Sequence, residues 1–209
     1  MAEAAYLAEN LYSRFPTGTI HFITTNMYME RLMPIVLVHC ESHYFIGVDN
    51  GVFSILFHQK DAQFRLLASQ VDEDWNLIIS GAIQQLTGGI AWNTIGTALE
   101  QLRQVKRPEP FIKESYVEGA VLFTDDFGNA ITNIKQEQVS SVFDLSKVII
   151  SFGASHRIQG IKKSIAEAAD HEPFAIFNAF GHLLLGMKNY NFSRLFDVKD
   201  GIKVALQAI

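Results

Sequence analysis

A short proline-containing segment divides this chain into two halves of different character. Residues 106–110 (KRPEP) combine two prolines with alternating charges and show no apolar periodicity, which is typical of a linker. Before it, strand-like apolar runs alternate with segments of helical period, and after it short strand-like runs follow one another. We therefore predict an α/β domain with a Rossmann-like layered sheet at 1–108 and an all-β barrel domain at 109–209.

The periodicities also predict individual elements. Helices are expected at 2–14, 75–86 and 93–105, where apolar residues recur every three or four positions. Strands are expected at 19–24, 34–40 and 43–48, and residues 52–59 fit either a helix or a strand. In the second half, short strands are expected at 116–123, 131–134, 147–152, 156–158, 174–177, 183–187 and 202–206.

Composition restricts the class of partner. The net charge is −5 and only 19% of the residues are charged, so no basic surface is expected for nucleic acid or an anionic membrane. The apolar runs are of strand length, well short of the roughly twenty residues of a transmembrane helix. Cys40 is the single cysteine, and we expect a buried thiol in a reduced, cytoplasmic protein. With 16 phenylalanines and few charges, the surface is expected to be partly covered by other subunits.

The segment most suggestive of a ligand site begins where an apolar run ends. The run TDDFGNAITNI occupies residues 124–134. Gly and Asn accept backbone angles that other residues avoid, so this run predicts a turn. Such a turn would place a carboxylate (Asp125), an apolar ring (Phe127) and an amide (Asn129) around one small volume. A hairpin turn without a ligand is the alternative interpretation.

Four segments, in the same order, resemble landmarks of the S-adenosylmethionine (SAM) hydroxide adenosyltransferases, relatives of the bacterial chlorinases and fluorinases. DDFGNAITNI at 125–134 resembles the family signature DxFGNxxTNI. FPTGTIH at 15–21 resembles FPxGTIH, GVDNGVF at 47–53 resembles the PDNG loop, and FAIFNAFG at 174–181 is similar to the NSxG segment. The resemblance implies an α/β half followed by a β-barrel half, in a homotrimer with the ligand pocket between subunits.

The resemblance also implies a reaction. Water or hydroxide would attack the 5′ carbon of SAM and displace methionine through its sulfur, giving adenosine and methionine. SAM would be the substrate or ligand, and no cofactor is implied. Because the leaving sulfonium is already cationic, the enzyme needs no acid to expel it, but must desolvate the nucleophile and align it with the C–S bond. The sequence has no HxxxH or HExxH pattern and no cysteine pair, so no metal site is predicted.

The catalytic set that the family implies is not intact. In the family an aspartate, an arginine and a histidine position the water. Arg31 matches the arginine, although a solvated surface arginine is the plainer interpretation. The aspartate position falls on Thr24, whose hydroxyl cannot replace a carboxylate as a base, and the histidine position falls on Asp74. The acidic run of Asp72, Glu73 and Asp74 is either a substitute base or a solvated loop.

The binding residues that the resemblance implies are better preserved. Asp125 would accept the amino group of the methionine moiety, while Phe127 and Asn129 would border the nucleoside. Asn178 opens a turn that would face the methionine end, but the family serine after it is Ala179 here.

Other positions depart further from the family. Adenine is usually held between aromatic rings, whereas the matching places here are Ile131 and Ile165, which bury apolar area without stacking. The backbone of residues 191–193 would meet the adenine amino group. Asp49 and Asn50 either contact the ligand or fix their loop through side-chain-to-backbone hydrogen bonds.

One family segment has no counterpart. Members normally begin with a strand and a DFG-type loop that holds the ribose hydroxyls, whereas this sequence begins at the helix that follows, through truncation or natural loss. We predict a SAM hydrolase with weak or altered activity. The first alternative is a non-catalytic trimeric protein that binds SAM or adenosine at a degenerate site, and the second is a structural trimer with a vestigial pocket.

Overall fold

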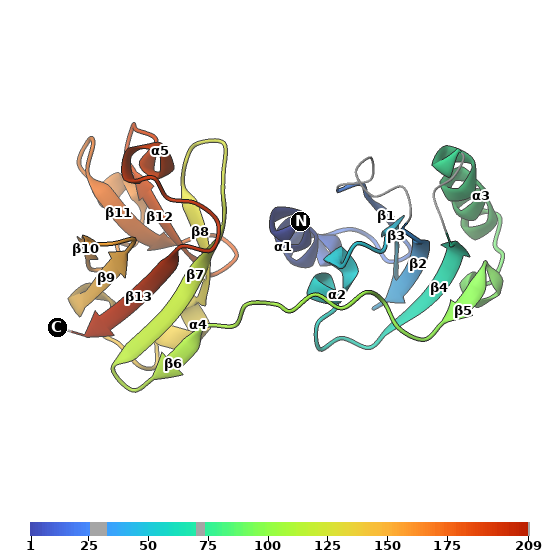
Figure 1. Cartoon of the computed structure of the whole chain (residues 1–209), viewed down its shortest axis with the longest axis horizontal. Helices are drawn as coiled ribbons and strands as arrows, with labels where there is room; N and C mark the ends of the chain where they lie inside the picture. Colours follow the sequence, from blue (N-terminus) through green and yellow to red (C-terminus); the bar gives the residue numbers. More distant parts are fainter. Residues whose placement is uncertain (26–32, 70–73, 209) are drawn as a thin grey trace. The chain divides into compact units, whose positions relative to one another are not determined.

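The computed structural model describes residues 1–25, 33–69 and 74–208. The chain divides into two compact units, Met1–Arg107 and Pro108–Ile209, each with its own core (Figure 1). Helices occur mainly in the first unit, and none in the described part of the chain is long and apolar enough to cross a membrane.

The first unit is built on a mixed five-stranded sheet in the order β1-β3-β2-β4-β5. β1 and β3 are parallel, and every other neighbouring pair is antiparallel. The finer expectation of a Rossmann-like layered sheet is therefore not confirmed. The strands are β1 (Ile20–Ile23), β2 (Ile35–Cys40), β3 (His43–Val48), β4 (Ala62–Ala68) and β5 (Thr97–Leu99).

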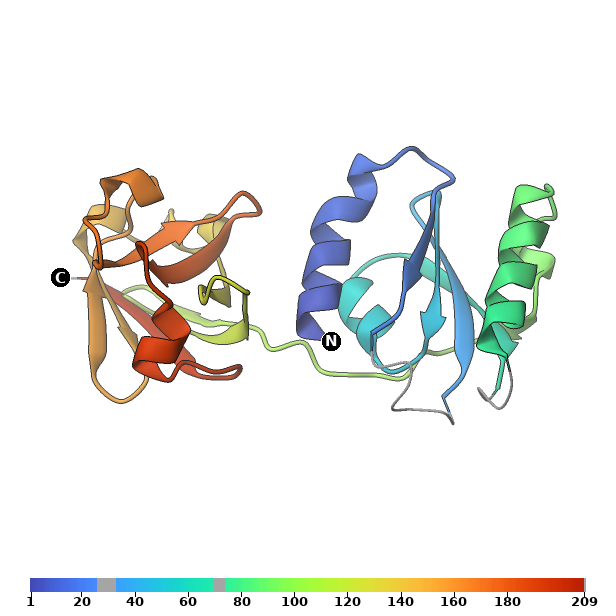
Figure 2. The same cartoon turned by 90° about the horizontal axis from the view of Figure 1, so that it is seen from above.

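Helices cover both faces of this sheet (Figure 2). α1 (Ala2–Leu11) and α2 (Val52–Leu56) pack on one face, and α3 (Trp75–Thr87) packs on the other. Because successive strand residues point to opposite faces, β2 supplies Val36 to the first core and Leu37 to the second. Burial on both faces explains why this strand is a continuous apolar run.

The predicted helix at 93–105 is wrong. A 3-10 turn, η2 (Trp92–Thr94), leads instead into β5 at the edge of the sheet. Gly96 has φ +65°, and a Cβ there would lie 2.2 Å from the carbonyl oxygen of Leu66 on β4. Arg65 Nη2 donates to the Gly96 carbonyl at 2.7 Å. These tertiary contacts with β4 override the helical periodicity of the segment.

The second unit is an antiparallel, nearly closed barrel in the order β10-β9-β13-β7-β8-β12-β11, with β6 added to β7. The end strands β10 and β11 approach each other. The strands are β6 (Phe111–Lys113), β7 (Tyr116–Thr124), β8 (Ala130–Lys135), β9 (Val148–Phe152), β10 (His156–Gln159), β11 (Pro173–Phe177), β12 (His182–Met187) and β13 (Lys203–Ala208). Short helical turns connect them: α4 (Gln136–Val139), η3 (Leu145–Lys147), η4 (Ile165–Glu167) and α5 (Phe192–Phe196).

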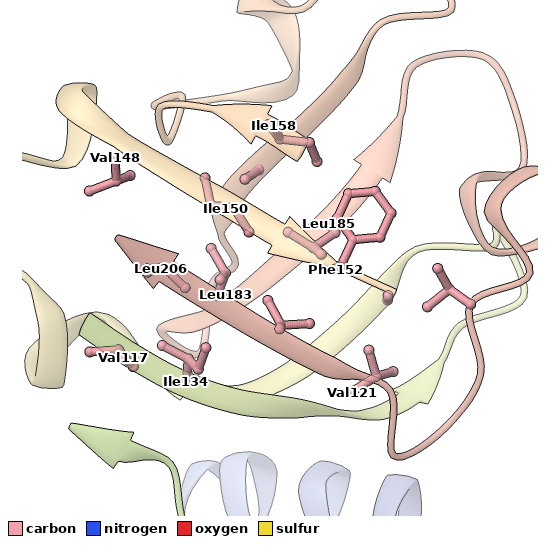
Figure 3. Packing of buried hydrophobic residues seen from close by; sticks show 14 of the residues in the cluster. Val117, Val121, Ile134, Val148, Ile150, Phe152, Ile158, Leu183, Leu185 and Leu206 are labelled. Atoms are coloured by element: carbon pink, nitrogen blue, oxygen red, sulfur yellow. The ribbon is translucent and has the colours of Figure 1, made fainter. Parts of the chain in front are cut away.

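Aliphatic side chains and the ring of Phe152 pack together inside the barrel (Figure 3). Ile150 of β9, Leu183 of β12 and Leu206 of β13 have no solvent-exposed surface. Alternate positions of β7, Val117 and Val121, point into the same core. The period-two pattern of the second half therefore corresponds to one interior shared by all the main strands.

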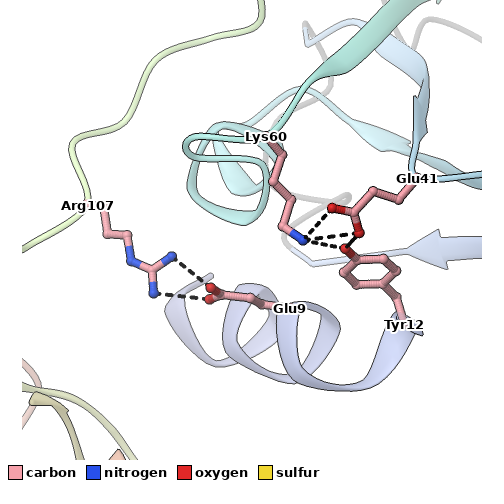
Figure 4. A network of polar contacts seen from close by, with 5 residues as sticks. All are labelled: Glu9, Tyr12, Glu41, Lys60 and Arg107. Atoms are coloured by element: carbon pink, nitrogen blue, oxygen red, sulfur yellow. Dashed lines mark hydrogen bonds and ion pairs between the residues drawn. The ribbon is translucent and has the colours of Figure 1, made fainter. Parts of the chain in front are cut away.

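A polar network fastens the end of α1 to the sheet of the first unit (Figure 4). The 3-10 turn η1 (Tyr12–Arg14) follows α1, and the Tyr12 hydroxyl donates to Glu41 and accepts from Lys60. Burial raises the pKa of Tyr12 and the bond to Glu41 raises it further, while the same bond lowers the pKa of Glu41. Arg107 forms a two-pronged ion pair with Glu9 of α1 at 3.1 and 3.2 Å, so the last residue of this unit is also tied to α1.

Truncating the barrel core should destabilise the protein markedly. Leu183→Ala is expected to lower the free energy of unfolding by about 2–5 kcal/mol, because the removed methyl groups leave a cavity in a closed interior. Leu195→Ala on α5 is the matched control, since Leu195 is 50% exposed and its loss should cost no more than about 0.5 kcal/mol. Urea unfolding followed by circular dichroism measures both, and similar losses would contradict the assignment of this core.

Candidate ligand-binding site

The turn between β7 and β8 is closed by its own backbone. The Asp125 amide donates to the Asn129 carbonyl at 2.9 Å, and the Gly128 amide donates to the Asp125 carbonyl at 2.9 Å. Gly128 has φ +84°, the left-handed conformation that glycine adopts without strain. The sequence pattern of an acidic residue followed by Gly-Asn therefore forms the tight turn that it predicts.

The Asp125 carboxylate organises this turn from within. Oδ1 accepts hydrogen bonds from the amides of Phe127 (3.0 Å) and Asn129 (2.8 Å). Oδ2 accepts one from Asn129 Nδ2 at 2.9 Å. A carboxylate has about four acceptor positions, so Oδ2 keeps capacity for a further donor. Asp125 is thus a structural residue that can also bind a ligand ammonium.

The bond to Asp125 decides which way the Asn129 amide points. A carboxylate only accepts, so it holds the Asn129 NH2 group, and Oδ1 faces the other way, toward Gly186 of β12. A Cβ at Gly186 would lie 2.5 Å from this oxygen, so only glycine leaves room for it. Among the described residues no donor binds Asn129 Oδ1, which leaves it available as an acceptor for a ligand.

The turn also docks on α5. The Ser193 amide donates to the Gly128 carbonyl at 2.9 Å, and Asn191 Oδ1 caps α5 by accepting from the Arg194 amide at 2.8 Å. A Cβ at Gly128 would lie 2.3 Å from Asn191 Oδ1. Within the backbone segment 191–193, which the resemblance places at the adenine amino group, the Ser193 amide is therefore occupied by the turn itself.

Beside the turn lies an open hollow of about 520 Å³. Phe127, which is 82% exposed, lines it together with Ile165 (45% exposed) and Tyr190 (51% exposed). Asn129 and Met187 also contribute to its wall. The structure thus brings three residues singled out from the sequence, Phe127, Asn129 and Ile165, to one hollow.

The lining of the hollow does not include three other candidates of this unit: Asp125, Ile131 and Asn178. Ile131 is 4% exposed, lies between β7 and β12, and pairs with Leu184. Asn178 follows β11, and its Oδ1 accepts from the amides of Phe180 (3.0 Å) and His182 (3.1 Å). Because Phe174 at the other end of β11 lines the hollow, Asn178 is about 13 Å away along the strand. Their roles toward a ligand stay predictions.

In the first unit, Asp49 and Asn50 bind backbone groups. Asp49 is buried, and its Oδ2 accepts from the Arg103 amide at 2.8 Å. Burial raises the pKa of Asp49, partly offset by that hydrogen bond and by the charge of Arg103. Asn50 donates to the Thr25 carbonyl at 2.8 Å and accepts from the Val52 amide at 3.1 Å. Both side chains therefore hold their loop in place.

The structure describes two of the candidate catalytic residues, Thr24 and Asp74. Thr24 follows β1 and is exposed, and Asp74 is exposed directly before α3. Arg31, Asp72 and Glu73 lie outside the described residues. In the described part of the chain, no three side chains of His, Cys, Asp or Glu lie close enough together to hold a metal ion.

Both halves of the sequence match one protein family. Residues 1–78 match the SAM hydroxide adenosyltransferase N-terminal domain, and residues 119–205 match the SAM hydroxide adenosyltransferase C-terminal domain. The chain belongs to the SAM hydroxide adenosyltransferase family. A comparison with curated proteins found no match.

Solved structures share the fold of this SAM hydroxide adenosyltransferase family member. An uncharacterized conserved protein from Thermotoga maritima matches with a TM-score of 0.84 and 18% identity, over 99% of this chain and 83% of the other. A conserved hypothetical protein from Thermus thermophilus matches with a TM-score of 0.78 and 20% identity, over 98% of this chain and 81% of the other. At these identities the likeness shows the fold alone.

Several residues of the site in this SAM hydroxide adenosyltransferase family member were not predicted from the sequence. Among them are Gly186, which makes room for Asn129, and Tyr190, which lines the hollow. Asn191 was expected to contribute only its backbone, whereas its side chain contacts Gly128. A glycine inside a strand is a signal of close backbone approach, so Gly186 could have been found. Nothing local marks Tyr190, or the Asn191 side chain as a contact of Gly128, because the partners of both lie far away in the sequence.

Gly128 offers a test of the contact between the turn and α5. Gly128→Ala should lower the free energy of unfolding by more than about 1 kcal/mol, because it combines a left-handed backbone with a clash against Asn191. Gly201→Ala is the matched control, since Gly201 has φ +82° but nothing within 4 Å of a Cβ. Urea unfolding gives both values, and equal losses would show that Asn191 does not restrict the turn.

Proposed function

We propose that this protein binds SAM at the turn of Asp125, Phe127 and Asn129 and hydrolyses it to adenosine and methionine at a low rate. The observation that carries the proposal is the preformed turn, in which Asp125 keeps an acceptor position and Asn129 Oδ1 is available beside an open hollow. Family membership supports SAM as the ligand. A homotrimer is part of the same proposal.

The proposed hydrolysis does not require proton transfer to the leaving group. Methionine departs as a neutral thioether from a sulfonium, so no general acid is required. Rate acceleration would come from holding a water in line with the C–S bond and from a base that takes its proton as the C–O bond forms. Arg31 and the acidic residues Asp72, Glu73 and Asp74 are the candidates for this work.

A second candidate function is binding without catalysis. It is favoured by the exposed hydroxyl of Thr24 at the end of β1, where the family has a carboxylate. A threonine hydroxyl cannot act as a base near neutral pH or pair with an arginine as a carboxylate does. The protein would then bind SAM or adenosine and leave both unchanged.

The two functions differ in adenosine production. Purified protein incubated with SAM should release adenosine and methionine in equal amounts, about 10²- to 10⁴-fold more slowly than a family member with an intact catalytic set, because a positioned base is missing. Chromatography of the two products measures this. Release at the rate of an intact member would show that another base has taken over, and binding without release would favour the second function.

The Asp125 carboxylate should distinguish SAM from adenosine. Asp125→Asn removes the charge that would meet the methionine ammonium, so SAM affinity should fall at least about tenfold more than adenosine affinity. The ratio is the relevant quantity, because the new amide also disturbs Asn129 and so affects both ligands. Phe127→Ala is the comparison, since it removes apolar wall from the nucleoside side and should weaken both ligands equally. Calorimetry measures each affinity, and an unchanged ratio on Asp125→Asn would contradict the ammonium contact.

A further inference from the structure

The turn that follows β12 places Tyr190 at the wall of the hollow. The Tyr190 amide donates to the Met187 carbonyl at 3.3 Å, and the preceding residue, Asn189, has φ +58°, which turns the chain sharply. The Tyr190 ring meets the His171 ring edge-on, with centroids 6.0 Å apart. The His171 amide in turn donates to the Lys188 carbonyl at 3.0 Å. The ring is therefore held from one side while it remains half exposed.

Two exposed aromatic rings line the same hollow. Phe127 is 82% exposed and Tyr190 is 51% exposed, whereas Met187, which also lines the hollow, is 8% exposed. Single exposed apolar residues are ordinary on a protein surface, but several around one concavity indicate a binding site. Aromatic walls suit a flat aromatic ligand, because ring faces stack and edges meet faces.

Of the residues considered as stacking partners of a nucleobase, Tyr190 has the most suitable position and support. Ile131 is buried and does not line the hollow, and Ile165 lines it but has no π surface. In the described part of the chain, Phe127 meets no other aromatic ring, so its ring lacks the support that His171 gives Tyr190. The hollow of about 520 Å³ is large enough for a nucleoside.

We propose that Tyr190 is the stacking partner of the ligand base, and thereby the residue that makes this hollow select a planar nucleobase. The proposal rests on the proposed function, in that the ligand is SAM or adenosine. It assigns the aromatic contact to the turn after β12, whereas the family resemblance points to positions 131 and 165, which are both isoleucine here. Asn129 lines the same hollow, and its Oδ1, which binds no donor among the described residues, would accept from an exocyclic amino group of the base.

The test compares variants that separate π stacking from apolar area. Tyr190→Phe keeps the ring and should bind adenosine and SAM within about twofold of the parent. Tyr190→Leu keeps apolar area without a ring, and Tyr190→Ala removes both, so each should weaken both ligands by about tenfold or more. Phe111→Ala is the control, since Phe111 is 54% exposed in the same unit but lies on β6, outside the hollow. Calorimetry with adenosine and with SAM gives the affinities.

Each outcome decides one of the two proposals. If the parent binds and Tyr190→Leu binds as tightly, the stacking role is refuted while the proposed function stands. If the parent binds neither SAM nor adenosine, the proposed function fails and the stacking role fails with it. Light scattering on Tyr190→Ala completes the test, because a weakened variant that also changes its oligomeric state would show that the ring serves contacts between subunits, which overturns the proposal.

Discussion

The three hydrogen bonds that the Asp125 carboxylate accepts are the constraint on which the candidate site depends. They bend the chain between β7 and β8, orient the Asn129 amide and leave Phe127 exposed at the tip. Without them the Asn129 oxygen would have no fixed direction, and the hollow would lose one wall. A single carboxylate thus links the local turn to the shape of the surface beside it.

Two glycines allow close contacts between this turn and other elements of the barrel. Gly128 lets the turn touch Asn191 at the start of α5, and Gly186 leaves room on β12 for the Asn129 oxygen and for the Phe174 ring. Side chains at either glycine would push these elements apart. The barrel core, filled from β9, β12 and β13, holds the strands rigid enough for such narrow contacts to persist.

The groups suited to ligand binding are better preserved in this protein than those suited to catalysis. The acceptors and the apolar wall that would hold a nucleoside are formed within the second unit, from residues of a few neighbouring turns. The positions that the resemblance assigns to the activation of water are Thr24 and Asp74 in the first unit. Both are exposed, and they do not carry the carboxylate and the imidazole that the resemblance leads us to expect there. Binding needs shape and a few fixed polar atoms, whereas hydrolysis also needs a base at the reacting atom.

Much of the fold could be predicted from local patterns. The buried strand β2, the helix α3 and the alternating strands of the barrel follow from periodicity, because burial on one or two faces leaves a repeating trace in the sequence. The prediction of a helix at 93–105 was wrong because Gly96, in that segment, packs against β4 and accepts a hydrogen bond from Arg65 of β4. No local pattern reveals this contact.

The same division applies to the site. The sequence by itself determined the turn of Asp125, Gly128 and Asn129, since its hydrogen bonds join residues within five positions of one another. Only the tertiary structure decided that Tyr190 and Ile165 share a hollow with this turn and that Asn178 does not. The physical reason is that turn geometry depends on neighbouring residues, whereas the walls of a pocket depend on how strands pair and on which side chains packing leaves exposed.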